Sequence, residues 1–393
     1  ALVAIDRSIA LNRQDDGLYH AYNLLEVGDD QVGVGHLYPM LEGQVAVLSS
    51  GALSPEAAID VLEHLFASPV FRGELGTFML YPDRRLPRFL DRNRPDPAAV
   101  DDVALLRQML ADGDTRLVYR DVDDVVRFNA AFTNAGDVER ALDEAGADAE
   151  DRAQVLALYE AVFDHQAFTG RSGTMFGFEG LGCVYWHMVA KLLLAVQENF
   201  FRARDTGADA KVVEQLARLY YRVRAGIGFN KTPVEYGAFP VDPYSHTPGH
   251  SGASQPGMTG QVKEEILTRF GELGVRVQEG MAAFDPSLLR RREFRQAAGI
   301  FCVLTVDGDW EEVTVPRRSL AFSWCQVPVL YRLEDGAEGS IAIKDADGRE
   351  RTMAGLRLSR ADSQAIFARS GAVRRLTVTF DPETLLEQVT DGG

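Results

Sequence analysis

Apolar side chains recur every three or four residues in several segments between residue 1 and about residue 290, which is the spacing of one face of an α-helix. Segment 54–68 starts with Ser54 and Pro55, residues that favour the N-cap and first position of a helix. Similar patterns predict further helices at 96–113, 137–146 with Asp137 as its cap, 148–166, 181–205, 209–226 and 259–274 with Thr259 as its cap. We therefore predict a mainly α protein whose domain 1–290 is a helical bundle or an (α/α)-toroid-like domain.

The pattern changes near residue 295 to short runs of alternating apolar residues separated by Gly and Asp. This two-residue period predicts β-strands at 299–306, 310–315, 319–333, 339–345, 351–358 and 373–381. One helical segment, 360–371, interrupts them. We predict a smaller C-terminal antiparallel β-sandwich at 295–385.

The chain is acidic, with 58 Asp and Glu against 41 Lys and Arg and a net charge of −17. Such a surface repels nucleic acid and anionic membranes, so neither is an expected partner. No apolar run reaches the ~18 residues of a transmembrane helix. The three cysteines are far apart and form no C-x-x-C pair, which indicates neither a disulfide framework nor a thiolate zinc site. We expect a cytoplasmic protein.

A glycine-rich polar segment at 164–180 is the first candidate for chemistry. It carries Asp164, His165, Arg171 and Glu179, together with Phe176 and Phe178 on either side of Gly177. Aromatic faces stack on the C–H faces of a sugar ring, and carboxylates and Arg hydrogen-bond its hydroxyls. A structural connection whose Arg and Asp pair with each other is the alternative. The following helix places His187 and Lys191 four residues apart on one face, which indicates a binding site or a structural salt bridge.

A second polar stretch, 228–261, leads into the last predicted helix. Its candidate binding and catalytic residues are Lys231, Glu235, Tyr236, Asp242, His246, His250, Gln255, Thr259 and Gln261. Free N–H groups at the helix start favour an anion there, although the loop would also be explained if it only satisfied its own backbone. Asp242, His246 and His250 are spaced like metal ligands, but the intervening prolines prevent a single helical face. Towards the N-terminus, a further pocket would be lined by His20, Tyr22, Asn23, Glu42 and Gln44.

The phrases "GFEGLGCVYWHMVAKLLLAVQE" and "GAFPVDPYSHTPGHSGASQPGMTGQVKEEILTR", followed by a β-rich end, resemble long bacterial proteins related to six-hairpin (α/α toroid) carbohydrate enzymes. The nearest analogy is with cellobiose phosphorylase-like glycoside phosphorylases. In those enzymes a Thr-Gly segment before a late barrel helix helps to hold phosphate, as "MTGQ" at 258–261 would here. A "GDWND"-type acid motif is absent from this sequence. The resemblance implies that the chain is the C-terminal part of a larger protein.

We predict a carbohydrate-active enzyme that cleaves a glycosidic bond with inversion, by water or by phosphate. Glu179 is the expected general acid, because Phe176 and Phe178 would raise its pKa by desolvation. Asp242 or Glu235 would be the base of a hydrolase. Substrate contacts are expected from Asp164, His165, Arg171, His187, Lys191, Lys231, Tyr236, His246, His250, Gln255, Thr259 and Gln261. No cofactor is expected beyond inorganic phosphate as co-substrate. The alternatives are a non-catalytic glycan-binding or scaffolding fragment and a metal-dependent hydrolase or lyase using His246 and His250.

Overall fold

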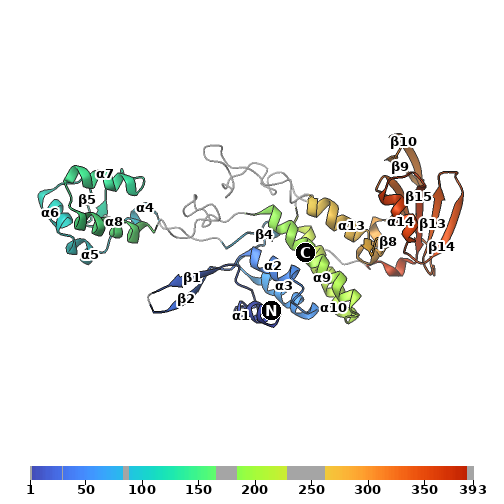
Figure 1. The fold of residues 1–393 in the computed structure, drawn as a ribbon, viewed down its shortest axis with the longest axis horizontal. Helices are drawn as coiled ribbons and strands as arrows, with labels where there is room; N and C mark the ends of the chain where they lie inside the picture. The colour runs from blue at the N-terminus through green and yellow to red at the C-terminus, as the bar shows by residue number, and fades with distance from the viewer. Residues whose placement is uncertain (1, 29, 83–87, 165–183, 228–261, 387–393) are drawn as a thin grey trace. The chain divides into compact units, whose positions relative to one another are not determined.

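A computed structural model describes residues 2–386 apart from 29, 83–87, 165–183 and 228–261 (Figure 1). The described residues form two compact units. Unit 1 contains residues 2–80, 184–227 and 262–386, and unit 2 contains residues 81–164. The predicted change from helices to strands near residue 290 falls inside unit 1, which therefore holds both kinds of structure.

The helical part of unit 1 packs around the long helix α9 (Trp186–Asp205). Its other helices are α1 (Leu2–Leu11), α2 (Leu41–Ser49), α3 (Pro55–Ala67) and α10 (Ala210–Ala225). The predicted cap of α3 is present, since the Ser54 side chain accepts a hydrogen bond from the Ala57 N–H. Two hairpins lie between these helices, β1 (Asn23–Val27) with β2 (Val32–His36) and β3 (Phe71–Arg72) with β4 (Thr77–Phe78). The shared core is built from buried aliphatic and aromatic side chains such as Leu192, Val196 and Tyr220.

The segment predicted as one helix at 259–274 begins, within the described residues, as the π-helix η3 (Val262–Leu267). It continues as the short α-helix α13 (Thr268–Glu272). Both elements pack against α9. Chain reversal follows at Gly274, whose φ of +74° favours glycine. The predicted cap Thr259 lies outside the described residues.

The β part of unit 1 centres on a five-stranded sheet with strand order β11-β12-β15-β13-β14. Its strands are β11 (Ser319–Trp324), β12 (Val327–Leu333), β13 (Ser340–Asp345), β14 (Glu350–Ala354) and β15 (Val373–Phe380). Strands β12 and β15 run parallel, so this sheet is mixed and not antiparallel throughout. The parallel pair arises because the chain crosses over through α14 (Arg360–Phe367) before β15 enters the sheet.

Two separate hairpins precede this sheet in sequence. They are β7 (Val275–Gln278) with β8 (Met281–Phe284), and β9 (Gly299–Leu304) with β10 (Trp310–Val315). Two 3₁₀ turns, Pro286–Leu288 and Arg291–Glu293, connect them. Phe284, Tyr331 and Phe380 are buried in one aromatic core shared by the hairpin β7–β8 and the sheet.

A buried ionic network holds the helical and β parts of unit 1 together. Glu272 is 1% exposed and accepts from Arg224, from the Arg269 guanidinium at 2.6 Å and from the Tyr220 hydroxyl at 2.7 Å. Arg269 also reaches Glu293 at 2.7 Å. Burial and the adjacent Glu272 carboxylate raise the pKa of Tyr220 well above its usual value, so its hydroxyl stays protonated and donates. Each charge in this network has a partner, which identifies it as a structural joint.

Unit 2 is a small helical domain with one hairpin. It contains α4 (Phe89–Arg92), α5 (Pro97–Asp102), α6 (Ala104–Asp112), β5 (Val118–Arg120), β6 (Val126–Phe128), α7 (Ala135–Ala145) and α8 (Ala149–Phe163). The predicted helix 96–113 is broken at Val103, whose extended backbone separates α5 from α6. The predicted cap Asp137 is the third residue of α7. Asn134 is the N-cap, and the Asp137 side chain closes the capping box.

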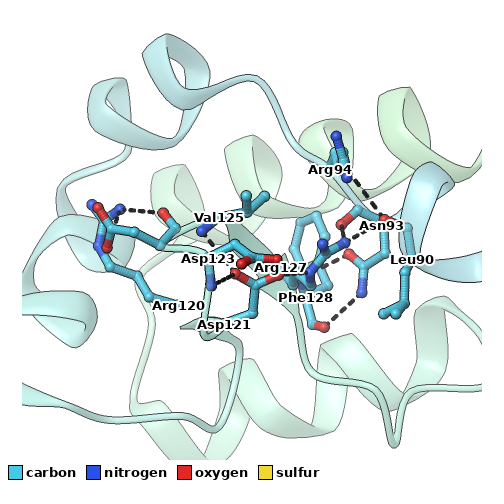
Figure 2. Close-up of polar contacts among 10 residues, drawn as sticks. Leu90, Asn93, Arg94, Arg120, Asp121, Asp123, Val125, Arg127 and Phe128 are labelled. Atoms are coloured by element: carbon cyan, nitrogen blue, oxygen red, sulfur yellow. Dashed lines mark hydrogen bonds and ion pairs between the residues drawn. The ribbon is translucent and has the colours of Figure 1, made fainter.

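Arg127 is the centre of a polar network inside unit 2 (Figure 2). Its side chain is 5% exposed, and its guanidinium pairs with Asp121 and donates to the carbonyls of Leu90 and, at 3.1 Å, Asn93. The Asn93 side chain, fully buried, donates to Phe128 O and accepts from Phe128 N, both at 2.8 Å. These bonds join α4 to the β5–β6 hairpin and satisfy the polar groups that the fold buries.

Candidate anion site at His187

The first turns of α9 place His187 and Lys191 on one face, as the sequence predicted. The Nζ atom of Lys263, from η3, lies 3.3 Å from His187 Nε2. On the other side of the ring, the Tyr185 hydroxyl lies 3.1 Å from Nδ1. All four side chains are half-buried. The elements α9 and η3, which are more than fifty residues apart in sequence, thus bring an imidazole and two ammonium groups together.

These contacts fit a neutral His187 that carries its proton on Nδ1. Nε2 then accepts from the Lys263 ammonium, and the Nδ1–H donates to the Tyr185 hydroxyl. The pKa of His187 is lowered from its usual value, chiefly by burial and then by the charges of Lys191 and Lys263. Glu42 acts in the opposite direction. Burial and, after it, the two nearby cations therefore favour the uncharged imidazole.

Glu42 lies in the first turn of α2, which packs against α9. The Tyr22 hydroxyl donates a short hydrogen bond to its carboxylate. Tyr22 and Glu42 were among the residues predicted to line an N-terminal pocket, and the structure places Glu42 within electrostatic range of His187. We call Tyr22, Glu42, Tyr185, His187, Lys191 and Lys263 the His187 cluster.

The other residues of that predicted N-terminal pocket have structural contacts. Gln44 is buried and its amide binds both backbone groups of Tyr19, at 2.9 and 2.8 Å. His20 stacks on His36 with ring centroids 3.9 Å apart. The Asn23 Oδ1 atom lies 3.0 Å from His36 Nδ1 and accepts its hydrogen in the tautomer protonated there. Gln44 supports the start of α2, and His20 and Asn23 contact His36, the last residue of the hairpin β1–β2.

The cations of the His187 cluster differ from most others in the described chain. Within the residues that the structure describes, neither Lys191 nor Lys263 forms a salt bridge with a carboxylate. The N-cap residue of α9, Tyr185, makes no side-chain cap bond to the first N–H groups. The start of a 20-residue helix therefore adds positive potential beside the two ammonium groups. Such a group of donors suits a phosphate or another small oxyanion.

Of the residues predicted from sequence to form the site, Asp164, His187 and Lys191 are described. Asp164 belongs to unit 2, ends α8 in a left-handed conformation with φ of 52°, and lies 3.8 Å from Arg92. The predicted residues outside the described part are Glu179, Glu235, Asp242, His165, Arg171, Lys231, Tyr236, His246, His250, Gln255, Thr259 and Gln261. Their roles, and the predicted meeting of the two polar loops, stay predictions.

Lys263 is the main residue that sequence reasoning missed. It follows the "MTGQ" segment by two positions, so it belonged to a segment already assigned to anion binding. The helix predicted at 259–274 gave no reason to choose Lys263 as a site residue. Its contact with His187 depends on the π-helical turn η3, which no pattern in the sequence indicated.

Two absences concern only the described residues. Among them, no group of three or more His, Cys, Asp and Glu side chains is arranged to hold a metal ion. The proposed metal ligands His246 and His250 lie outside this part. None of the helices in the described ranges combines the length and the apolar character needed to cross a membrane.

A family model described as GH149 phosphorylase insertion domain 2 matches residues 86–166. The matched residues include the described part of unit 2 from 88 to 164, with the Arg127 network at its centre. The match relates the chain to glycoside phosphorylases and does not single out the cellobiose phosphorylases. No curated protein matches the chain.

Proposed function

We propose that this chain is part of a glycoside phosphorylase and that the His187 cluster binds the phosphate. The observation that carries the proposal is the contact of Lys263 with a neutral His187, beside Lys191, with no salt bridge from either lysine to a described carboxylate. The relation of residues 86–166 to a phosphorylase insertion domain supports it independently. Sugar and phosphate are then the expected substrates.

Electrostatics favour an anion at this cluster over a neutral ligand. Burial, and then repulsion from two ammonium groups, lower the pKa of His187 and favour its uncharged form in the free protein. An arriving phosphate would offset that repulsion and accept hydrogen bonds from both lysines. It would also let His187 take up a proton and become a further donor. The cluster is therefore more favourable when occupied by an anion than when empty.

The proposed reaction is phosphorolysis with inversion. An oxygen of phosphate attacks the anomeric carbon, the bond from that carbon to the glycosidic oxygen breaks, and a carboxylic acid gives its proton to the leaving oxygen. The products are a sugar 1-phosphate and an oligosaccharide shortened by one unit. Glu179 is our candidate for the acid, between Phe176 and Phe178. Since phosphate is the nucleophile, this reaction needs no second carboxylate, whereas a hydrolase would use Asp242 or Glu235.

One observation favours a second candidate, a non-catalytic glycan-binding or scaffolding module. The family model describes an insertion domain and not the catalytic part of a phosphorylase. Such a module would bind oligosaccharide without consuming phosphate. The two candidates therefore differ in a product that can be measured directly.

The test is to incubate the chain with oligosaccharides of different sugars and linkages, with and without phosphate, and to measure sugar 1-phosphate. Phosphate affinity is measured in parallel by calorimetry on wild type, Lys263→Met and the matched surface variant Lys211→Met, whose lysine is exposed on α10. We expect phosphate-dependent product and weaker binding in Lys263→Met alone. Equal phosphate affinity in both variants would contradict the proposed anion site at Lys263. Binding of glycan without formation of sugar 1-phosphate would favour the non-catalytic module over the phosphorylase.

A further inference from the structure

The π-helical turn η3 is an unusual element in this chain, because π-helices are rare and occur frequently at functional sites. It lies directly before α13 and carries Lys263 to His187. A π-turn holds one residue more than an α-turn. If η3 returned to α-geometry while α13 stayed in place, Lys263, near the start of the turn, would rotate about the helix axis, by up to roughly 100° for one residue of shift. Lys263 would then leave His187.

A buried amide on α9 lies against the junction between η3 and α13. Gln197 is 4% exposed, and its Nε2 donates to the carbonyl of Thr268, the first residue of α13, at 2.8 Å. The same Nε2 lies 3.3 Å from the Tyr220 hydroxyl, which in turn donates to Glu272. Gln197 therefore connects the π/α junction to the rigid ionic joint of unit 1.

The close approach of α13 to Gln197 requires glycine at residue 271. A Cβ atom built on Gly271 would lie 2.0 Å from Gln197 Oε1. The Gln197 side chain thus fills the space that a larger residue at 271 would occupy. Thr268 and Glu272, on either side in sequence, are each 1% exposed. Gln197 thus packs closely against Gly271 and donates a hydrogen bond to Thr268 O. These two contacts leave α13 little freedom to slide along α9.

We infer that Gln197 is a positioning residue that fixes the π-turn η3 and so holds Lys263 against His187. The hydrogen bonds of Gln197 within the described residues are to Thr268 O and the Tyr220 hydroxyl, and not to His187 or Lys263. Gln197 therefore acts on Lys263 through Thr268 and the π-turn. This inference rests on the proposed function only where it predicts an effect on phosphate affinity. The positioning itself is a property of the protein without ligand.

The ionisation of His187 reports the position of Lys263. Among the described residues, the charged or ionisable groups that act on the ring are Lys191 on its own helix, Lys263 from η3, Glu42 from α2 and the Tyr185 hydroxyl. Loss of Lys263 from this set removes one cation that opposes protonation, so the pKa of His187 must rise towards its usual value of about 6.5. A change that only loosens the fold elsewhere on α9 leaves all four groups in place.

The experiment is NMR titration of protein labelled in its histidine rings, with the His187 signal assigned by its loss in His187→Gln. Gln197→Met removes the donor and keeps the volume, and Lys263→Met gives the pKa of His187 without its neighbour. Asn199→Leu is the matched control, because the Asn199 amide is also buried on α9 but bonds Leu48 O and Ala195 O, both at 2.8 Å. Gly271→Ala provides an independent route to displacing Gln197.

We expect the pKa of His187 to rise in Gln197→Met and Gly271→Ala to the value in Lys263→Met, and to stay at the wild-type value in Asn199→Leu. An unchanged pKa in Gln197→Met, or an equal rise in Asn199→Leu, would overturn the positioning role. Phosphate affinity is measured on the same samples. If the His187 pKa moves as expected and no variant or wild type binds phosphate, the positioning holds and the proposed function fails.

Discussion

Arg127 in unit 2 and Lys263 in unit 1 are both cations drawn away from bulk water, but the chain surrounds them differently. Arg127 has a carboxylate and two backbone carbonyls as acceptors. Lys263 faces the nitrogen of a neutral imidazole. A second ammonium group, Lys191, lies on the same side and adds repulsion. The surroundings of Arg127 are explained by folding alone, because each of its contacts satisfies a group that the fold buries.

The surroundings of Lys263 differ, because its acceptor is a neutral imidazole and a second cation adds repulsion that only Glu42, among the described residues, is shown to oppose. The proposed anion would add the negative charge that offsets this repulsion. The comparison separates the two kinds of evidence for function. Relatedness to phosphorylases lies in unit 2, at residues 86–166, whereas the proposed anion site lies in unit 1.

The largest effect that tests this contrast is on stability. Arg127→Met removes the donor to Asp121 Oδ2 and the Arg127 hydrogen bonds to the carbonyls of Leu90 and Asn93. We expect unit 2 to lose about 3 kcal/mol of unfolding free energy. Hydrogen exchange of the intact chain, read over residues 88–164, measures the loss. The matched control is Arg120→Met, whose pair with Asp124 is exposed at 3.5 Å and whose loss should cost less than about 1 kcal/mol. Equal protection in the two variants would show that Arg127 is not a structural centre.

A second prediction concerns the two lysines of the His187 cluster. Each of Lys191→Met and Lys263→Met should weaken sulfate or phosphate binding by about tenfold, or ~1.4 kcal/mol. Neither should lower the free energy of unfolding, because each removes a cation that has no salt bridge among the described residues. Calorimetric titration and urea unfolding of the same samples measure both quantities. Destabilisation of several kcal/mol, as for Arg127→Met, would mean that the lysines are structural and that the contrast is wrong.

The sequence predicted local structure best where one side chain determines it. Ser54 and Pro55 fixed the start of α3, and Gly113 ends α6 with a φ of 70°. The helical face shared by His187 and Lys191 followed from spacing alone. Predictions were less accurate for the continuity of one helix and for the strand arrangement of the sheet. Val103 breaks one predicted helix into two, and the parallel register of β12 with β15 depends on the crossover through α14.

The candidate site shows the same limit. The sequence supplied residues of the right chemistry, His187 and Lys191, and it drew attention to the polar segment before residue 262. It did not supply Lys263 as their neighbour, because that contact depends on a π-turn held by Gln197 and Gly271 from another element. The carboxylate near His187 is Glu42, which comes from α2, more than a hundred residues away in sequence. Such a constellation is a tertiary property, and no local period encodes it.

The smallest predicted effect is the dependence of anion binding on pH. The folded protein lowers the pKa of His187, through burial and the charges of Lys191 and Lys263. The unfolded chain therefore binds this proton more readily, so acidification through about pH 6.5 favours unfolding until the lowered pKa is passed. A bound anion reverses the balance, because its charge stabilises the imidazolium. Sulfate, whose charge is constant in this range, should bind a few-fold more tightly at pH 5.5 than at pH 7.5, a difference of roughly 0.5–1 kcal/mol in binding free energy.

Binding of sulfate should also take up protons, which calorimetry in two buffers of different ionisation enthalpy measures. In His187→Gln both the pH dependence and the proton uptake should disappear. Retention of both in that variant would assign them to another group, and His187 would then be only a neighbour of the two lysines.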